Sequence, residues 1–206
     1  MPMTGAPNTT TLTFSGKTLD FANPKAKAID IVDIAHGLAG ENRFNSQIRR
    51  FFSVAEHSVL VAIRVEEIGR PDLAFAALLH DAPEAYTRDI VKPLKVLLGP
   101  GYQRITGQLE KAIGKRFGVD PALFKDAVVK AADDHVYEIE AAHLQRGMEA
   151  DRLGVRILYE GPHAWSAPWP IGLQADAAQA LFEMHFKRLS ERAAAAGWLS
   201  PAKGTG

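Results

Sequence analysis

The chain has 206 residues, 47% of them hydrophobic, so it is long enough to bury one core and short enough for a single domain. Lys+Arg and Asp+Glu both number 24, and this neutral balance argues against a protein that mainly grips the backbone of long nucleic acid. The chain has no cysteine, which excludes disulfides, thiolate nucleophiles and sulfur-ligated zinc. His, Asp and Glu remain as the strong metal ligands.

The first residues lack the basic start and apolar run of a secretory signal, and no stretch has the length of apolar sequence that a membrane span needs. We therefore expect a cytoplasmic protein without a membrane partner. We expect one domain over residues 1–206 with its core at about 30–196, and flexible ends at 1–9 and 200–206.

The first predicted element is a short β-hairpin, because residues 10–21 alternate around Ser15 and Gly16. From Asp30 the pattern becomes helical, and Gly40 marks its end. The apolar stripe of this helix consists of Ile31, Ile34, Ala35 and Leu38. A loop rich in arginine and phenylalanine, ENRFNSQIRRFFS, follows.

Two helices are predicted next. The first covers residues 54–67 and stops at the sequence GRP, and the second starts at Asp72. The run LAFAALLH in the second helix is apolar almost all round, which is typical of a helix at the centre of a bundle. It ends in His80 and Asp81. Pro83 would remove a backbone hydrogen bond there but fits the first turn of a new helix, so the chain should bend just after Asp81.

Further helices are predicted from about Tyr102 to Phe117, from Pro121 to about Met148 and from about Leu173 to Ala196. The segment between the last two is irregular and aromatic, and its Trp165 and Trp169 are expected to pack over the core. The sequence thus predicts an all-α bundle of about six helices with a small N-terminal hairpin.

The strongest candidate for chemistry is the segment HDAPEAYTRD at residues 80–89. His80 and Asp81 end an apolar core helix, where an unpaired charge is costly to bury, and a divalent cation would hold them. Glu84, four residues after His80, can face the same point. The alternative is a helix-capping Asp81 beside a His80 imidazole bonded to the backbone.

Two more polar groups interrupt apolar helix faces. His57 lies in the helix at 54–67, and Asp133 with Asp134 lies in the helix predicted from Pro121. Three helices would then supply two His and two Asp, a nitrogen–oxygen set suited to Mn, Fe, Co, Ni, Zn or Mg. A lone histidine is more often a core or surface residue, and only one of the two aspartates is expected to be a ligand. The residues interpreted as structural or exposed are Glu56, His36, His135, His143, His163 and His185.

The order of these motifs is similar to that of the HD-domain metal-dependent phosphohydrolases. The chain has EHS at 56–58, HDAPEAYTRD at 80–89 and KAAD at 130–133. It most resembles the small branch that contains bacterial 5'-deoxynucleotidases and phage dATP triphosphohydrolases, and the resemblance covers residues 43–140. The resemblance implies an HD-domain helical bundle that holds one divalent metal ion, with a homodimer as an option.

Carried over by position, the resemblance assigns roles to nine residues. The implied metal ligands are His57, His80, Asp81 and Asp133. Glu84 would be the acid or base that acts on metal-bound water, and Asp89 would stand near the reacting phosphate. The implied phosphate-binding residues are Arg43, Lys92 and Lys95, with Arg49 and Arg50 open as alternatives to Arg43 and with plain surface charge as the alternative role for each.

The predicted function is hydrolysis of a phosphate ester in a small-molecule nucleotide, a (deoxy)nucleoside 5'-monophosphate first, by attack of metal-bound hydroxide. One alternative is release of triphosphate from a dNTP at the same site. Another is a non-catalytic HD scaffold that binds a nucleotide or a protein partner. Two departures from relatives matter: Ala85 follows Glu84 where the ppGpp-hydrolysing branch has an acidic pair, and Arg88 stands where deoxynucleotidase relatives often have glycine.

Overall fold

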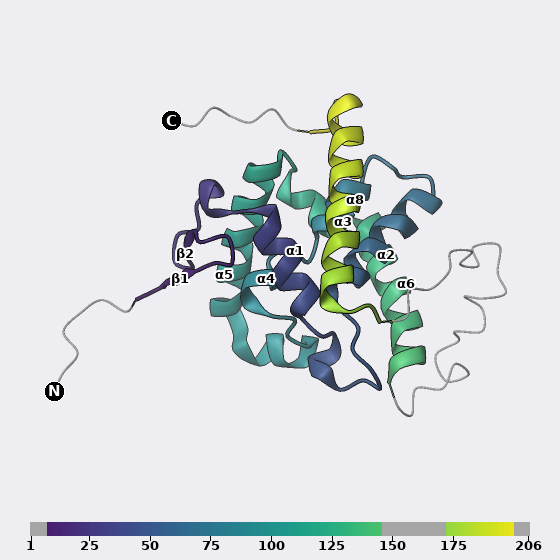
Figure 1. Cartoon of the computed structure of the whole chain (residues 1–206), viewed down its shortest axis with the longest axis horizontal. Helices are drawn as coiled ribbons and strands as arrows, with labels where there is room; N and C mark the ends of the chain where they lie inside the picture. Colours follow the sequence, from purple (N-terminus) through teal and green to yellow (C-terminus); the bar gives the residue numbers. More distant parts are fainter. Residues whose placement is uncertain (1–7, 146–171, 200–206) are drawn as a thin grey trace.

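The computed structural model describes residues 8–145 and 172–199 and is dominated by α-helices (Figure 1). The predicted positions Trp165, Trp169 and His163 lie outside the described residues. The elements in chain order are β1 (Thr10–Leu12), β2 (Thr18–Asp20), η1 (Ala26–Ala28), α1 (Ile31–Gly40), η2 (Phe44–Ser46), α2 (Val54–Glu67), α3 (Ala74–Leu79), α4 (Glu84–Thr87), α5 (Lys92–Phe117), η3 (Pro121–Lys125), α6 (Ala127–Leu144) and α8 (Ala175–Ala195), where η denotes a 3-10 helix.

The predicted hairpin is confirmed. β1 and β2 pair antiparallel with Thr11 opposite Leu19, and Gly16 takes a φ of 81° in the turn. The hairpin is attached to the bundle by Asp33 of α1, whose carboxylate accepts hydrogen bonds from the Ser15 amide at 2.5 Å and the Ser15 hydroxyl at 2.8 Å. Leu19 is fully buried, so the hairpin also extends the core.

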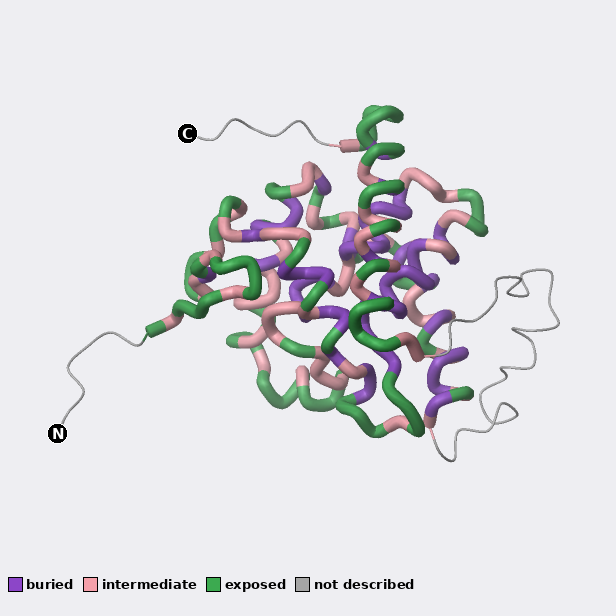
Figure 2. The backbone as a smooth tube through the Cα atoms, viewed as in Figure 1, coloured by how far each residue is buried: buried purple, intermediate pink, exposed green. Residues whose placement is uncertain are grey.

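The centre of the bundle is α2, which packs against α1, α3, α6 and α8. The backbone of α2 and α3 is mostly buried in Figure 2, and every residue of α3 is buried. α2 has the predicted bounds because a capping box fixes its start: the Ser53 hydroxyl accepts from the Glu56 amide, and the Glu56 carboxylate accepts from the Ser53 amide. Glu56 is therefore structural, as interpreted.

The predicted bend after Asp81 is also present. α3 ends at Leu79, and the next hydrogen bonds join residues three apart, from the Ala82 amide to the Leu79 carbonyl at 3.0 Å and from the Glu84 amide to the Asp81 carbonyl at 2.9 Å. α4 starts after Pro83, with no side-chain capping bond. The part of the alternative in which Asp81 caps a helix is thus wrong, whereas the other part is confirmed, because the His80 imidazole is hydrogen-bonded to the Ala77 carbonyl oxygen.

Three predicted helix starts need correction. The helix expected from Tyr102 begins ten residues earlier, at Lys92, and the break at Gly99, with a φ of 66°, separates the two parts. The helix expected from Pro121 begins at Ala127, because residues 121–125 form η3 and Asp126 then caps α6. α3 begins at Ala74 instead of Asp72. α1 and α8 lie where the sequence predicts them.

Among the described residues, six α-helices have six residues or more, and α4 is a single turn of four residues. This confirms the all-α bundle of about six helices with a small N-terminal hairpin. In this part of the chain, no helix combines the length and apolar character that crossing a membrane requires.

Candidate metal centre

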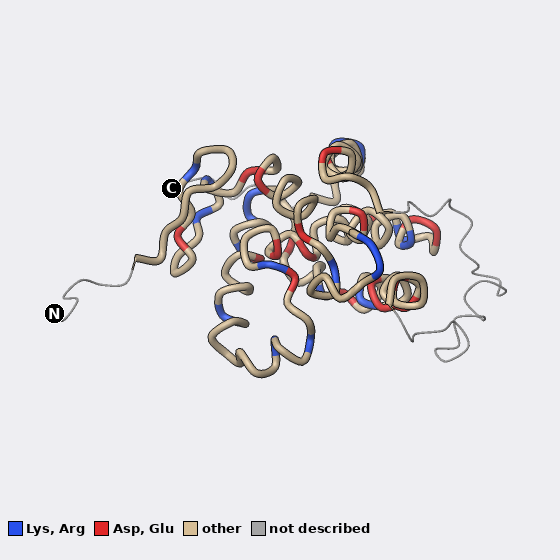
Figure 3. Tube along the Cα trace, turned by 60° about the horizontal axis from the view of Figure 1, so that its bottom comes forward, with Lys and Arg blue, Asp and Glu red and all other residues tan. Residues whose placement is uncertain are grey.

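Three residues from two helical segments, His57, His80 and Asp81, come together inside the bundle. One ligand atom from each of the three lies within 4.8 Å of the other two. His57 comes from α2 and is fully buried, while His80 and Asp81 come from the bend after α3. Figure 3 shows acidic positions in the middle of the trace as well as on its outside. This group could hold a metal ion.

The two imidazoles present the same ring nitrogen to the site. The Nδ1 of His57 lies 2.7 Å from Glu140 Oε1, and the Nδ1 of His80 lies 2.7 Å from the Ala77 carbonyl oxygen. A carboxylate and a carbonyl only accept, so both Nδ1 atoms carry a proton, and in the neutral imidazoles each Nε2 atom keeps its lone pair for a metal ion. Each Nε2 is buried and makes no hydrogen bond within the described chain. This is the state of a histidine prepared to bind a metal.

The carboxylates of Asp81 and Asp133 approach these nitrogen atoms. Asp81 Oδ2 lies 3.6 Å from His57 Nε2 and 3.3 Å from His80 Nε2. Asp133 Oδ1 lies 3.2 Å from His57 Nε2 and 3.9 Å from His80 Nε2. Neighbouring ligands at about 2.1 Å from one ion are separated by about 3.0–3.4 Å, so these distances fit a shared cation with small adjustments.

Of the two aspartates of α6, Asp133 is therefore the one that faces the site. It does not belong to the tightest group of three, but its Oδ1 atom reaches both imidazoles. Asp134 instead faces outward, where it pairs with Lys130 and with Lys92. The side chain of Asp134 is half exposed, whereas that of Asp133 is mostly covered.

The electrostatics of the site favour positive charge between its ligands. Burial and the Arg43 charge lower the pKa of His57, but Glu140 and Asp133 raise it more, so the net shift is upward. Burial alone would also lower the pKa of His80. Asp81 and Asp133 raise it by more, so the pKa of His80 lies well above its usual value. The pKa of Asp133 is held well below its usual range, because both imidazoles outweigh the effect of burial. A divalent ion would supply the positive charge that this arrangement favours.

Glu84 lies beside this group at the start of α4. Its Oε1 atom accepts a hydrogen bond from Lys95 Nζ at 2.8 Å, while its buried Oε2 atom has no described hydrogen-bond partner. Burial, together with Asp81 and Asp89, raises the pKa of Glu84 to about 8 despite the Lys95 charge. A carboxyl group that titrates near neutral pH is suited to general acid–base chemistry.

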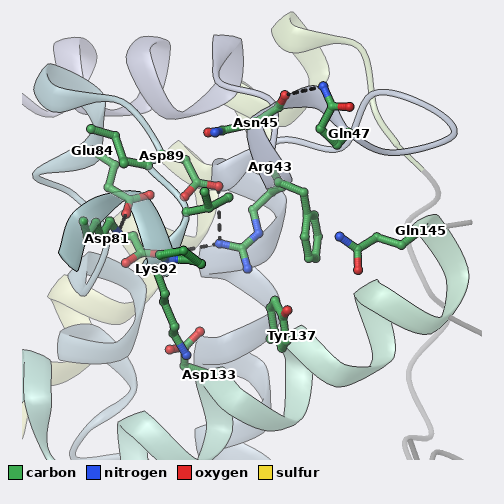
Figure 4. A pocket seen from close by; sticks show the side chains of 15 residues that line it. Arg43, Asn45, Gln47, Asp81, Glu84, Asp89, Lys92, Asp133, Tyr137 and Gln145 are labelled. Atoms are coloured by element: carbon green, nitrogen blue, oxygen red, sulfur yellow. Dashed lines mark hydrogen bonds and ion pairs between the residues drawn. The ribbon is translucent and has the colours of Figure 1, made fainter. Parts of the chain in front are cut away.

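A cavity of about 340 Å³ opens onto these residues (Figure 4). One end is charged and includes Asp81, Glu84 and Asp133. The other end is aromatic and amidic, and in Figure 4 Arg43 lies between the acidic residues on one side and Tyr137 on the other. The residues of this second end, called the amide end below, are Phe44, Asn45, Gln47, Tyr137 and Gln145.

All the predicted phosphate-binding residues line this cavity, in different ways. Arg43 is buried, pairs with Glu140 at 3.0 Å and stands 3.7 Å from Asp81 and 4.0 Å from Asp89. Lys95 is paired with Glu84, and Lys92 has an exposed side chain at the rim. Arg49 and Arg50, the alternatives to Arg43, are not among its lining residues.

Comparison with known proteins gives two relatives whose names state no activity. The chain is 40% identical over 149 residues to an uncharacterized protein of Rhodobacter capsulatus, a match that covers 66% of this chain and 74% of that protein. This chain belongs to the same family. Its similarity extends to the uncharacterized protein YfdR of Escherichia coli, at 40% identity over 121 residues, or 59% of this chain and 64% of YfdR. No family model matches the chain.

The sequence pattern did not identify Glu140 as a residue of the site. Glu140 is fully buried on α6, and its two oxygens bond His57 and Arg43. Burial raises the pKa of Glu140, but Arg43 and His57 lower it more, so the carboxylate is ionised. The available signal was its position seven residues after Asp133, two helical turns along the same face.

The amide end was not anticipated either. Phe44, Asn45 and Ser46 have successive φ values of 58°, 50° and 61°, a left-handed backbone that residues with a Cβ rarely adopt. Two of the other histidines lie away from the centre: His36 stacks on Phe14 with 3.8 Å between ring centroids, and His185 lies beside Arg188.

Proposed function

We propose that this protein is a metal-dependent phosphohydrolase of the HD-domain type, acting on a nucleoside 5'-monophosphate. The observation that carries the proposal is the convergence of two buried imidazole Nε2 atoms and two carboxylates from α2, the α3–α4 bend and α6. The ordered sequence motifs around these same four residues support the HD-domain assignment. Their chemistry fits one divalent cation of the Mn, Fe, Co, Ni, Zn or Mg group.

The residues around that centre can take the separate chemical roles that phosphate hydrolysis requires. A divalent ion bound by His57, His80, Asp81 and Asp133 would supply a hydroxide nucleophile at neutral pH and a charge for the phosphoryl oxygens. Glu84 holds or takes up the proton of the attacking water at its Oε2 atom, since Oε1 is committed to Lys95. Arg43 and Lys95 stabilise the negative charge that develops on the phosphoryl oxygens.

The cavity favours a monophosphate over a triphosphate. Its volume of about 340 Å³ is near the lower limit of ligand pockets, which are typically about 300–1,000 Å³. Its described cationic lining consists of Arg43, Lys92 and Lys95, and two of these already balance Glu140 and Glu84. A triphosphate would bring more negative charge than this set offsets. The dNTP triphosphohydrolase remains the second candidate, because the same metal chemistry serves both.

The amide end suits a planar, polar group such as a nucleobase. Phe44 and Tyr137 contact each other with 5.4 Å between ring centroids and offer an aromatic wall. Asn45, Gln47 and Gln145 add side chains that can both donate and accept hydrogen bonds. A phosphate at the charged end would place the sugar and base of a nucleotide toward this wall.

A non-catalytic scaffold is the rival of another class. It would be favoured by a missing ligand or a missing acid–base residue. All four ligand residues and Glu84 are present, and a raised pKa such as that of Glu84, about 8, is more typical of a reacting group than of a residue that only binds.

The test is metal analysis of the purified full chain, followed by chelation and return of each candidate metal. Release of phosphate from dAMP and of triphosphate from dATP is then measured separately, with Glu84→Gln as the control for a contaminating phosphatase. We expect metal-dependent release of phosphate from the monophosphate. Absence of metal-dependent hydrolysis of any nucleoside mono- or triphosphate would reject the proposal, and release of triphosphate alone would favour the second candidate.

A further inference from the structure

Glu140 is a buried carboxylate to which the proposed reaction gives no direct part. It lies on α6 with its side chain fully covered, and each of its oxygens has a separate partner. Oε1 accepts from His57 Nδ1 at 2.7 Å, and Oε2 accepts from Arg43 Nε at 3.1 Å and lies 3.0 Å from the terminal Arg43 nitrogen Nη2. One side chain therefore connects α2 to the arginine of the cavity.

We infer that Glu140 is a positioning residue that prepares the metal centre through two partners at once. Toward His57 it fixes the tautomer with the proton on Nδ1, which leaves Nε2 free to bind the ion. Toward Arg43 it supplies the balancing charge that keeps this guanidinium from competing with the ion for Asp81. The role of Arg43 toward phosphate rests on the proposed function, but the effect on metal binding does not.

The charges of the site support this division. A divalent ion would be balanced by Asp81 and Asp133, while Lys95 is hydrogen-bonded to Glu84 at 2.8 Å. Arg43 stands 3.7 Å from Asp81 and is largely buried, so its charge needs a carboxylate other than the metal ligand. Glu140, at 3.0 Å, is the nearest such carboxylate, and Asp89 lies farther away at 4.0 Å. Without Glu140, the Arg43 guanidinium would pair with Asp81, and Asp81 would then bind the ion less strongly.

A glutamine substitution at this position separates the two roles from simple space filling. Glu140→Gln keeps the size of the side chain but offers a single acceptor oxygen, whereas His57 and Arg43 both donate. The amide nitrogen of the glutamine is itself a donor and would face one of these two donors, so one hydrogen bond would be lost. Outer-shell partners of metal-binding histidines typically contribute about 10–100-fold to metal affinity, and we expect a loss in this range.

The second variant makes the inference specific. In Arg43→Gln/Glu140→Gln the competing charge is gone, and the amide oxygen of the new side chain at position 140 can turn to His57 Nδ1. We therefore expect the double variant to bind metal more tightly than Glu140→Gln alone. A residue that merely fills the core would predict the opposite, because two changes in one buried cluster would disturb packing more than one. Glu138→Gln, on the same helix and outside the cluster, is the matched control.

The experiment uses the full-length protein without substrate. Co²⁺ and Mn²⁺ affinities are measured by competition with a chelator, and the histidine tautomers of the metal-free protein are determined by ¹⁵N NMR at a pH high enough for both imidazoles to be neutral. We expect Nδ1–H for His57 in the wild type and in Glu138→Gln, and a mixture of tautomers in Glu140→Gln. Circular dichroism verifies folding, and Glu140→Asp, which keeps the charge but shortens the reach, replaces the glutamine variant if that variant does not fold.

Unchanged metal affinity in Glu140→Gln, or in its aspartate substitute, would overturn the inference. So would a double variant that binds no better than the single one, or a His57 tautomer that does not respond. Because none of these measurements involves hydrolysis, the inference can stand when no nucleotide is cleaved, and it can fail when the protein is an active phosphohydrolase.

Discussion

The charged end of the cavity together with the candidate metal group beside it, called the metal end below, and the amide end are built in different ways. At the metal end, His57, His80 and Asp133 stand on or directly beside helices. The ring of each histidine is fixed by a hydrogen bond at its Nδ1 atom. At the amide end, Phe44 and Asn45 belong to a short turn with left-handed backbone, next to exposed side chains. The metal end is thus rigid through packing, and the amide end depends on local backbone conformation.

This difference teaches where precision is needed. Metal binding requires ligand atoms placed within a few tenths of an ångström, and helices of a packed core hold side chains that closely. Recognition of a planar base tolerates more variation, which a turn can supply. We therefore expect changes at the metal end to abolish chemistry and changes at the amide end to alter affinity.

The largest effect should come from the ligands themselves. His80→Ala and Asp81→Ala each remove an inner ligand, so we expect metal and activity to be lost together, with a larger loss of affinity than the 10–100-fold, roughly, that outer-shell partners contribute. Metal content after dialysis and phosphate release measure the two effects. Asp134→Ala is the matched control, because Asp134 faces Lys130 and Lys92 instead of the site. Full metal content in Asp81→Ala would mean that the ion does not lie there.

Removal of the acid–base group should separate binding from turnover. Glu84→Gln leaves the ligands in place, so we expect normal metal content and a loss of about 10²–10⁴-fold in kcat. Single-turnover rates together with metal analysis test this. A Glu84→Gln protein with the wild-type rate would remove Glu84 from the mechanism, even if the metal site is correct.

The raised pKa of Glu84 also predicts a pH dependence of stability in the metal-free protein. The carboxyl group titrates near 4.5 in the unfolded chain and at about 8 in the folded one, so between these values the folded state binds more protons. The contribution of Glu84 to stability is therefore fully present below about pH 4.5 and is lost as the pH rises to about 8. Urea unfolding of wild type and Glu84→Gln from pH 5 to 8 should show the steeper decline in the wild type. Parallel curves would contradict the upward shift.

At the amide end the effect should be smaller and confined to binding. Tyr137→Ala removes an aromatic surface whose stacking is typically about 0.5–1.5 kcal/mol, so we expect KM for dAMP to rise several-fold while kcat is kept. Deoxyribose 5-phosphate, which has no base, is the matched substrate, and its KM should change little. An equal rise of KM for both substrates would show that Tyr137 does not face the base.

The sequence pattern indicates the candidate metal group far better than it indicates the amide end. His57, His80, Asp81 and Asp133 interrupt apolar helix faces, and a charge in such a place needs a partner, so the pattern itself signals a site. Glu140 interrupts the same face of α6, but its partner Arg43 is 97 residues away, and a single chain does not show that pairing. Such a contact depends on tertiary packing.

The errors in the fold have local causes. Gly99-Pro100 is a typical helix boundary, so the sequence predicts a helix only after it. The chain is also helical before this break, from Lys92 onward. The left-handed turn at residues 44–46 contains no glycine, so the sequence carries no signal for it. The structure thus departs from the sequence pattern where the backbone takes a conformation that its residue types do not favour.

One strained residue, exposed at the end of α4 and outside the cavity lining, gives the smallest predicted effect. Arg88 ends α4 with φ 72° and ψ 157°, a region that only glycine adopts without cost, and glycine is what resembling deoxynucleotidases often have there. Arg88→Gly should relieve about 1–3 kcal/mol of strain but cost about 0.5–1 kcal/mol in chain entropy and up to about 1 kcal/mol from the lost ion pair with Glu41.

Arg88→Ala separates these contributions, because it loses the ion pair as Arg88→Gly does but keeps the Cβ atom and therefore the strain. We expect Arg88→Gly to be more stable than Arg88→Ala by about 1 kcal/mol in urea unfolding, although glycine normally destabilises relative to alanine. A less stable glycine variant would mean that the backbone at Arg88 is relaxed.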